Sequence, residues 1–172
     1  MGIKINQTMG KMVLDISDAN NLPLVTVESI LYRYLLRLSE KLEKERSVVI
    51  PGITSVKVIY DTETNEYFVR GRVSPALRKR LLQLDENGEA STTLSSSVVR
   101  DISDKLILPI ITVDIVLRGF IEGLLRQAEE TGLIDIPNVS AIKVTRSEDG
   151  DLTTRGRVSP ALQSKLRLLD AG

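Results

Sequence analysis

The octapeptide RGRVSPAL occurs twice in this sequence, and each copy sets two arginines on either side of a glycine: Arg70 and Arg72 in the first, Arg155 and Arg157 in the second. If each copy forms an extended strand, its two arginines point to the same face, because side chains alternate along a strand. A guanidinium group stays charged at physiological pH, and its planar fork of donors fits a phosphate or a carboxylate. The repeated arginines therefore predict a surface that binds anions.

Catalytic chemistry has few candidate residues in this chain. Its 172 residues include no histidine and no cysteine. Histidine is the commonest general base near neutral pH, and both residue types are common metal ligands. No motif pairs two carboxylates for acid–base work. We therefore expect a protein that is not an enzyme and that has no catalytic residues, no cofactor and no metal site.

The similarity between the two halves extends far beyond the octapeptide. DISDA in the first half matches DISDK in the second, LPLVTVESIL matches LPIITVDIVL, and VIPGITSVKV matches DIPNVSAIKV. Similarity along the whole of both halves indicates a duplicated unit. We place the repeats at residues 1–85 and 98–172, joined by a linker at residues 86–97 that is rich in Ser, Thr, Gly and acidic residues.

Each repeat carries the signals for two helices, a short three-stranded β-sheet and a short C-terminal helix, which makes an α+β fold. The first helices are predicted near residues 8–20 and 95–106. Thr26 and Thr112 are good N-caps and predict where the second helices begin. Alternating apolar residues in ITSVKVIY and YFVRGRV predict strands. A Ser-Pro pair after the last strand of each repeat predicts the start of the final helix.

The second helix of each repeat has an apolar stripe at helical spacing, which is typical of a face that packs into a core. The stripes consist of Val27, Ile30, Leu31, Tyr34, Leu35, Leu38 and Leu42, and of Val113, Val116, Leu117, Phe120, Ile121, Leu124 and Ala128.

This order of elements resembles the HU/IHF family of bacterial histone-like DNA-binding proteins. The resemblance rests on the long second helix, on VVIPGITSVKV and IDIPNVSAIKV where the family has a Gly-containing strand pair, and on RVSPALRKRL and RVSPALQSKL where it has a Pro-led final helix. It implies two interlocked copies of the fold whose sheets form a saddle under DNA. In this chain both copies would pair within one molecule, so we expect a monomer that is an intramolecular pseudo-dimer with a pseudo-twofold axis.

One feature departs from that family, whose long basic β-arms embrace the minor groove. The corresponding positions here hold DTETNE and SEDGD, which are short and acidic. We therefore expect DNA to be bent only weakly.

The resemblance implies that the sheet arginines form a basic floor for double-stranded DNA. Binding is expected to be weak and salt-sensitive, because 23 basic and 23 acidic residues leave the chain without net charge and phosphate contacts depend on salt. The predicted nucleic-acid-binding residues are Arg70, Arg72, Arg155 and Arg157 on the strands, extended along the final helices by Arg78, Lys79, Arg80, Lys165 and Arg167.

Alternatives remain open for these residues and for the protein. The arginines could instead pair with acids across the sheet, such as Glu66 or Asp151, and the glycine between them could mark a bulge or a close approach of backbone. The protein could then be an interaction or assembly module with a protein partner, for example in a phage particle, that has lost DNA binding. No apolar run is long enough to span a bilayer, so we expect no membrane association and a cytoplasmic location, in a bacterial nucleoid, a phage-infected cell or a virion.

Overall fold

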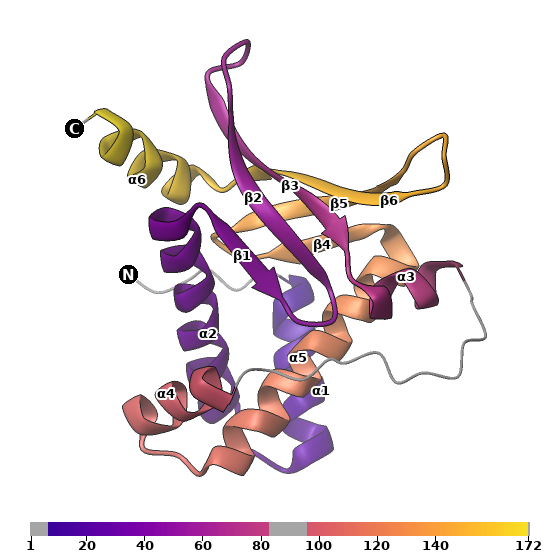
Figure 1. Ribbon diagram of the computed structural model, residues 1–172. Helices are drawn as coiled ribbons and strands as arrows, with labels where there is room; N and C mark the ends of the chain where they lie inside the picture. Colours follow the sequence, from indigo (N-terminus) through magenta and orange to yellow (C-terminus); the bar gives the residue numbers. More distant parts are fainter. Residues whose placement is uncertain (1–6, 83–95, 172) are drawn as a thin grey trace.

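The computed structural model describes residues 7–82 and 96–171, and these form six helices and one curled six-stranded antiparallel sheet. The predicted α+β class is confirmed. Most of the helical layer lies below one face of the sheet, and the opposite face is open (Figure 1). We call this second surface the open face. The predicted linker lies outside the described residues, apart from Ser96 and Ser97, which begin a helix.

Both halves of the chain supply the same elements in the same order. The first half forms α1 (Gln7–Asn20), α2 (Leu24–Glu45), β1 (Ser47–Ile50), β2 (Thr54–Asp61), β3 (Glu66–Val73) and α3 (Pro75–Leu82). The second forms α4 (Ser96–Leu106), α5 (Ile110–Thr131), β4 (Leu133–Ile136), β5 (Ser140–Arg146), β6 (Leu152–Val158) and α6 (Pro160–Ala171). The strand order is β1-β2-β3-β6-β5-β4, so the two halves meet where β3 pairs with β6.

The second helices start earlier than their sequence predicts. Leu24 and Ile110 are their first residues, and the residues at the cap are Pro23 and Pro109. Thr26 is therefore not an N-cap, because its own N–H already donates to the Pro23 carbonyl oxygen at 3.1 Å. The same correction applies to Thr112. Proline is tolerated at the start of a helix because a backbone N–H at that position would have no hydrogen-bond partner within the helix.

Both halves share one hydrophobic core, to which each contributes the apolar stripe of its second helix. Every residue of the two predicted stripes is buried. Tyr34 of α2 and Phe120 of α5 occupy equivalent positions in the two repeats, and their rings meet edge to face with centroids 6.1 Å apart. The long helices therefore cross at matching points, in the geometry that aromatic pairs prefer.

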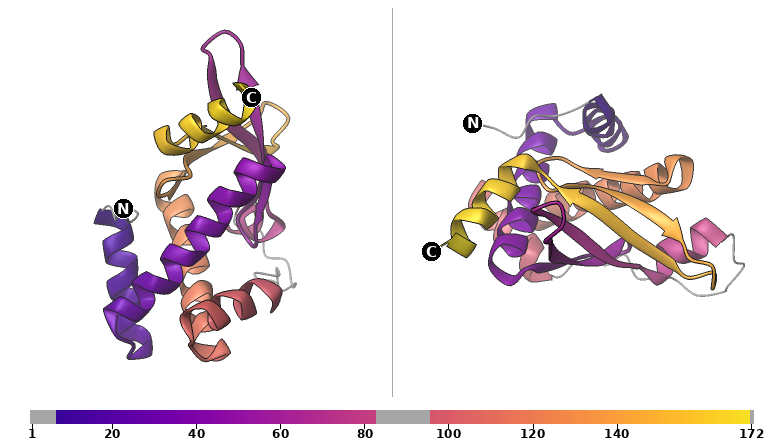
Figure 2. Two further views of the ribbon diagram at one scale, coloured as in Figure 1. Left: turned by 90° about the vertical axis from the view of Figure 1, so that its left-hand side faces the viewer. Right: turned by 90° about the horizontal axis from the view of Figure 1, so that it is seen from above.

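The C-terminal helix of each half packs against the other half. α3 contacts α5, and α6 contacts α2 and β3, so the two short helices lie at opposite ends of the sheet (Figure 2). The side-chain amide of Gln163 on α6 is buried against Tyr67 of β3. Its oxygen accepts a hydrogen bond from the backbone N–H of Tyr67 at 2.9 Å, and its nitrogen donates one to the backbone carbonyl oxygen of Tyr67 at 2.6 Å. The two halves are therefore held together in two ways: the C-terminal helix of each half packs on the other half, and β3 pairs with β6.

The predicted caps of these last helices are confirmed. The hydroxyls of Ser74 and Ser159 accept hydrogen bonds from the N–H groups of Leu77 and Leu162, at 3.1 and 3.3 Å. SPAL in the repeated octapeptide is thus a strand-to-helix junction, which leaves the RGR segment to be explained by the sheet.

Candidate anion-binding site

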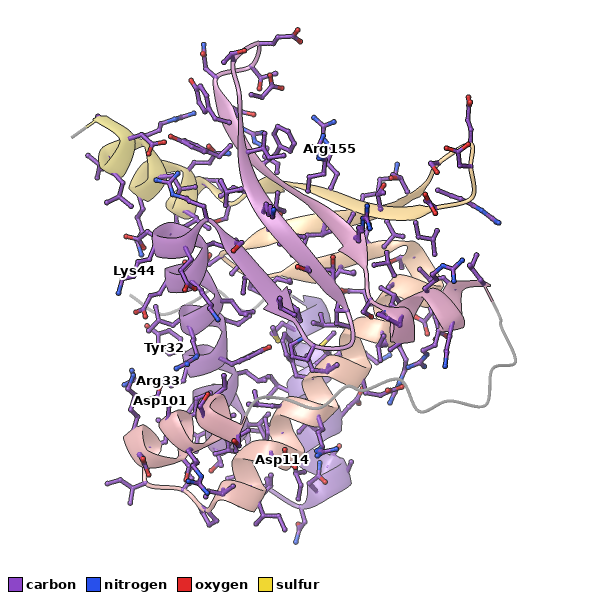
Figure 3. All side chains as sticks on the ribbon, in the orientation of Figure 1. Tyr32, Arg33, Lys44, Asp101, Asp114 and Arg155 are labelled. Atoms are coloured by element: carbon purple, nitrogen blue, oxygen red, sulfur yellow. The ribbon has the colours of Figure 1, made fainter. Side chains whose placement is uncertain are left out.

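The RGR segments lie at the centre of the sheet, on the two strands that join the halves. Arg70 of β3 and Arg155 of β6 are exposed, whereas Tyr67 and Val69 are buried on the opposite face. The predicted alternation is therefore confirmed, and all four arginines of the two segments project from the open face. Figure 3 shows Arg155 rising from this face, away from the helical layer.

A row of four cations crosses the open face at right angles to the strands. The ladder register places Lys57 of β2 opposite Arg70, Arg70 opposite Arg155, and Arg155 opposite Lys143 of β5. Adjacent strands are about 4.8 Å apart, so the row spans about 14 Å. We call these four residues the basic row.

The arrangement of the basic row is unfavourable for folding. Like charges directly opposite one another on neighbouring strands destabilise a sheet, and the row contains three such pairs in succession. Ser47, opposite Lys57, and Leu133, opposite Lys143, are uncharged. Bound anions would relieve this repulsion.

The two lysines of the basic row were missed by the sequence analysis. Lys57 and Lys143 are exposed and stand at matching positions in the repeats. Their signal lay in the paired segments SVKV and AIKV, which place one lysine among alternating apolar residues in both copies. Only the cross-strand register shows that they align with the arginines.

The flanking arginines, Arg72 and Arg157, differ in their partners although they are counterparts in the two repeats. The Arg157 guanidinium forms an ion pair with Glu66 at the start of β3. Arg72 lies between Ser55 of β2 and Thr153 of β6, both uncharged. Pairing with a carboxylate, the alternative considered for these arginines, therefore occurs at one of the two.

An aromatic ring adds a second asymmetry beside the basic row. The Arg155 guanidinium lies over the Phe68 ring at 4.3 Å from its centroid, which is a cation–π contact. Thr153 takes the position of Phe68 in the other repeat. Both residues of the pair, together with Arg157 and Glu66, line an open hollow of about 400 Å³ beside the β2–β3 hairpin.

The glycine in each RGR segment is required by a close approach of backbone. A β-carbon at Gly71 would lie 1.7 Å from the carbonyl oxygen of Ser55, and one at Gly156 would lie 2.3 Å from that of Ala141. Heavy atoms cannot approach so closely without a shift of the neighbouring strand. Of the two explanations considered for this glycine, the structure supports close approach.

The hairpin ends that flank the open face are acidic. The β2–β3 turn follows Asp61 and contains Glu63, and the β5–β6 turn contains Glu148 and Asp149. The Asp61 carboxylate accepts a hydrogen bond from the backbone N–H of Glu63 at 2.9 Å, which folds the turn back on itself. A polyanion on the open face would therefore be attracted by the basic row and repelled at the hairpin tips.

The predicted cations of the final helices lie outside the sheet. Arg80 of α3 forms ion pairs with Glu122, at 2.8 Å, and Glu129 of α5. Its partial burial acts to lower its pKa, but the two carboxylates outweigh this and hold the pKa above its ordinary value. Arg80 thus has a structural partner. Arg78 and Lys165 are exposed, Lys79 is half-buried, and Arg167 donates a hydrogen bond to the Asn65 carbonyl oxygen at 3.0 Å.

Residues 7–82 and 96–171 show neither a metal site nor a membrane-spanning helix. No group of three or more acidic side chains there is placed to hold a metal ion. None of the helices in these ranges has the length and apolar character needed to cross a bilayer.

No protein-family model matches the chain, and no curated protein matches it either.

Proposed function

We propose that this protein is a non-enzymatic DNA-binding protein of HU/IHF type, whose open face contacts the phosphates of a duplex. The observation that carries the proposal is the basic row, in which Lys57, Arg70, Arg155 and Lys143 oppose one another without an interposed acid. Repulsion among these four cations lowers the stability of the folded protein. Phosphate groups lying over the row would relieve this repulsion. The central pair also provides two planar forks of donors for phosphate oxygens.

The proposed architecture is a pseudo-dimer of two HU/IHF-like repeats within one chain. Two pairs of counterparts support it, because Tyr34 meets Phe120 between the long helices and Arg70 meets Arg155 between the strands. Both pairs would lie on one pseudo-twofold axis. Static light scattering is expected to give the 19.1 kDa mass of a single chain, and an obligate dimer would contradict this architecture.

The expected affinity follows from the number of phosphate contacts. Each neutralised phosphate contributes about 0.9 to the slope of log affinity against log salt concentration, so four contacts predict a slope of about −3.6. Contacts with phosphates carry no direct sequence information. Because both hairpins of the described residues end in short acidic turns, neither extends a basic arm toward the minor groove, and bending is expected to be weak.

The test is fluorescence anisotropy of a labelled duplex with the wild type and with Arg70→Ala/Arg155→Ala. The double variant should bind at least tenfold more weakly at low salt. Arg100→Ala/Arg118→Ala is the matched control, because it removes the same charge from exposed positions on α4 and α5. Absence of binding by the wild type, or equal loss in both double variants, would contradict the proposal.

A second candidate function, a protein-interaction or assembly module, is favoured by an apolar end of the helical layer. The α1–α2 and α4–α5 connections lie at the end of the molecule far from the sheet (Figure 1). Val25 and its counterpart Ile111 are 68% and 67% exposed beside them, and Ile107 is 90% exposed. If the wild type fails to bind duplex DNA at low salt, this end becomes the leading candidate surface.

A further inference from the structure

We propose that Glu66 competes with phosphate for Arg157, so that the two ends of the open face are unequal and the duplex is held at the Arg72 end. The inference rests on the proposed function. It assigns opposite roles to two arginines that the repeat makes equivalent, and it assigns to Glu66 the role of limiting affinity.

The contact that carries the inference is the ion pair between Arg157 and Glu66. The Arg157 side chain is 71% exposed and remains accessible, but one of its terminal nitrogens is occupied by a Glu66 carboxylate oxygen. A phosphate approaching this guanidinium must displace the carboxylate. One anion is then exchanged for another, so the contact adds little net affinity.

The other end of the open face has no such competitor. The counterpart of Glu66 is Asp151, whose side chain is one methylene shorter, and the counterpart of Arg157 is Arg72. Across the two described stretches, no carboxylate pairs with Arg72 and no hydrogen bond engages its guanidinium. The residues opposite it, Ser55 and Thr153, leave the donors of Arg72 available for a phosphate.

Structural stability does not require the Glu66 pair. An exposed ion pair contributes about 0–1 kcal/mol to folding. In addition, the hairpin register sets Glu66 directly opposite Asp61, a like-charge pair that is itself unfavourable. Neutral substitution of Glu66 should therefore leave the protein folded, which makes the effect on binding measurable.

The experiment compares Arg72→Ala with Arg157→Ala in duplex binding by anisotropy over a salt series. Arg72→Ala is expected to weaken binding severalfold and to reduce the salt slope by about one unit, as loss of a phosphate contact does. Arg157→Ala is expected to bind like the wild type. In the Glu66→Gln background, Arg157→Ala should become as damaging as Arg72→Ala.

Glu66→Gln itself is expected to tighten binding severalfold and to steepen the salt slope by about one unit. The matched control is Glu63→Gln, which removes the same charge from the same hairpin at an exposed position with no arginine contact of its own in the described structure. Thermal melts check that all variants are folded.

Three results would overturn the inference while leaving the proposed function intact: equal losses in Arg72→Ala and Arg157→Ala, unchanged binding in Glu66→Gln, or an equal gain in Glu63→Gln. The last result would show that general charge, and not the contact with Arg157, limits affinity. Absence of duplex binding by both the wild type and Glu66→Gln at low salt would overturn the inference and the proposed function together.

Discussion

Arg70 lies directly opposite Arg155 in the β3–β6 ladder, and the two arginines are counterparts in the duplicated sequence. The pairing of β3 with β6 therefore brings two arginines from matching positions of the two halves side by side, and Lys57 and Lys143 extend the row on either side. Such a pair is costly for an isolated protein and useful for one that binds a polyanion. The cost of this pair to folding and its proposed contribution to binding can both be measured.

Arg70→Gln is expected to stabilise the protein while weakening the proposed binding to DNA. The substitution removes repulsion with both Lys57 and Arg155, each opposed pair being worth about 0.2–1 kcal/mol. The free energy of unfolding, measured in urea at low salt, should therefore rise by about 0.4–2 kcal/mol for the two pairs together, and the gain should shrink at high salt because exposed charges are screened.

Arg118→Gln is the control for that measurement, because it removes the same charge from α5. Arg118 donates to Asp114 at 2.7 Å, one turn earlier on the helix, so the variant should lose up to about 0.5 kcal/mol. If Arg70→Gln is destabilised as much as Arg118→Gln, the repulsion attributed to the basic row is absent.

Gly71→Ala and Gly156→Ala are each expected to destabilise the sheet. Their β-carbons would meet carbonyl oxygens of neighbouring strands, and forcing extra atoms into such packing costs about 1–3 kcal/mol or more. Gly123→Ala makes the same chemical change on α5, where the new methyl would meet the Met12 side chain, which can move. Because alanine favours a helix over glycine by about 1 kcal/mol, this variant should match or exceed the wild type in chemical denaturation. Equal losses at all three positions would contradict the close approach of strands.

Acid should weaken the attachment of α6 through Asp170. Two hydrogen bonds hold the pKa of this carboxyl below its ordinary value of about 3.9. The larger effect comes from the Tyr67 hydroxyl, and the smaller from Arg46, which donates at 2.8 Å. A carboxyl with a depressed folded pKa adds stability that is complete above the unfolded value and is lost as pH falls through the folded one.

The melting temperature of the wild type should therefore fall more steeply than that of Asp170→Asn below about pH 4, so that the two curves converge. Asp149→Asn, in the exposed β5–β6 turn, serves as the control and should follow the wild type. Parallel curves for the wild type and Asp170→Asn would show that the contacts of Asp170 do not stabilise the folded state.

Much of this fold could be predicted because it depends on local signals. The stripe from Val27 to Leu42 has helical spacing, and all its members are buried as predicted. The serine caps of the last helices also follow from the sequence, because serine is favoured at the N-cap and proline at the first helical position. The predicted starts of α2 and α5 were wrong, because Pro23 and Pro109, three residues before the threonines, already occupy the cap positions.

The candidate site could not be predicted in full, because it depends on the order and register of strands that are far apart in the sequence. Alternation placed the arginines on one face, but only the register of β2, β3, β6 and β5 aligns Lys57 and Lys143 with them. The pairing of Arg157 with Glu66 required the β3–β6 register, and the carboxylate partners of Arg80 required the packing of α3 on α5. Arg72 and Arg157, at matching positions of the two halves, thus have different neighbours in the fold.

The most direct test of the central claim is the salt dependence of duplex binding by the wild type and by Lys57→Ala/Lys143→Ala. These lysines are joined to the arginines only by the cross-strand register, so their effect tests the basic row as a unit. If the basic row binds phosphates as a unit, the wild-type slope should be about −3.6 or steeper, and the slope of the double variant should be shallower by about 1.8. An unchanged slope in the double variant, or a wild-type affinity that does not depend on salt, would contradict it.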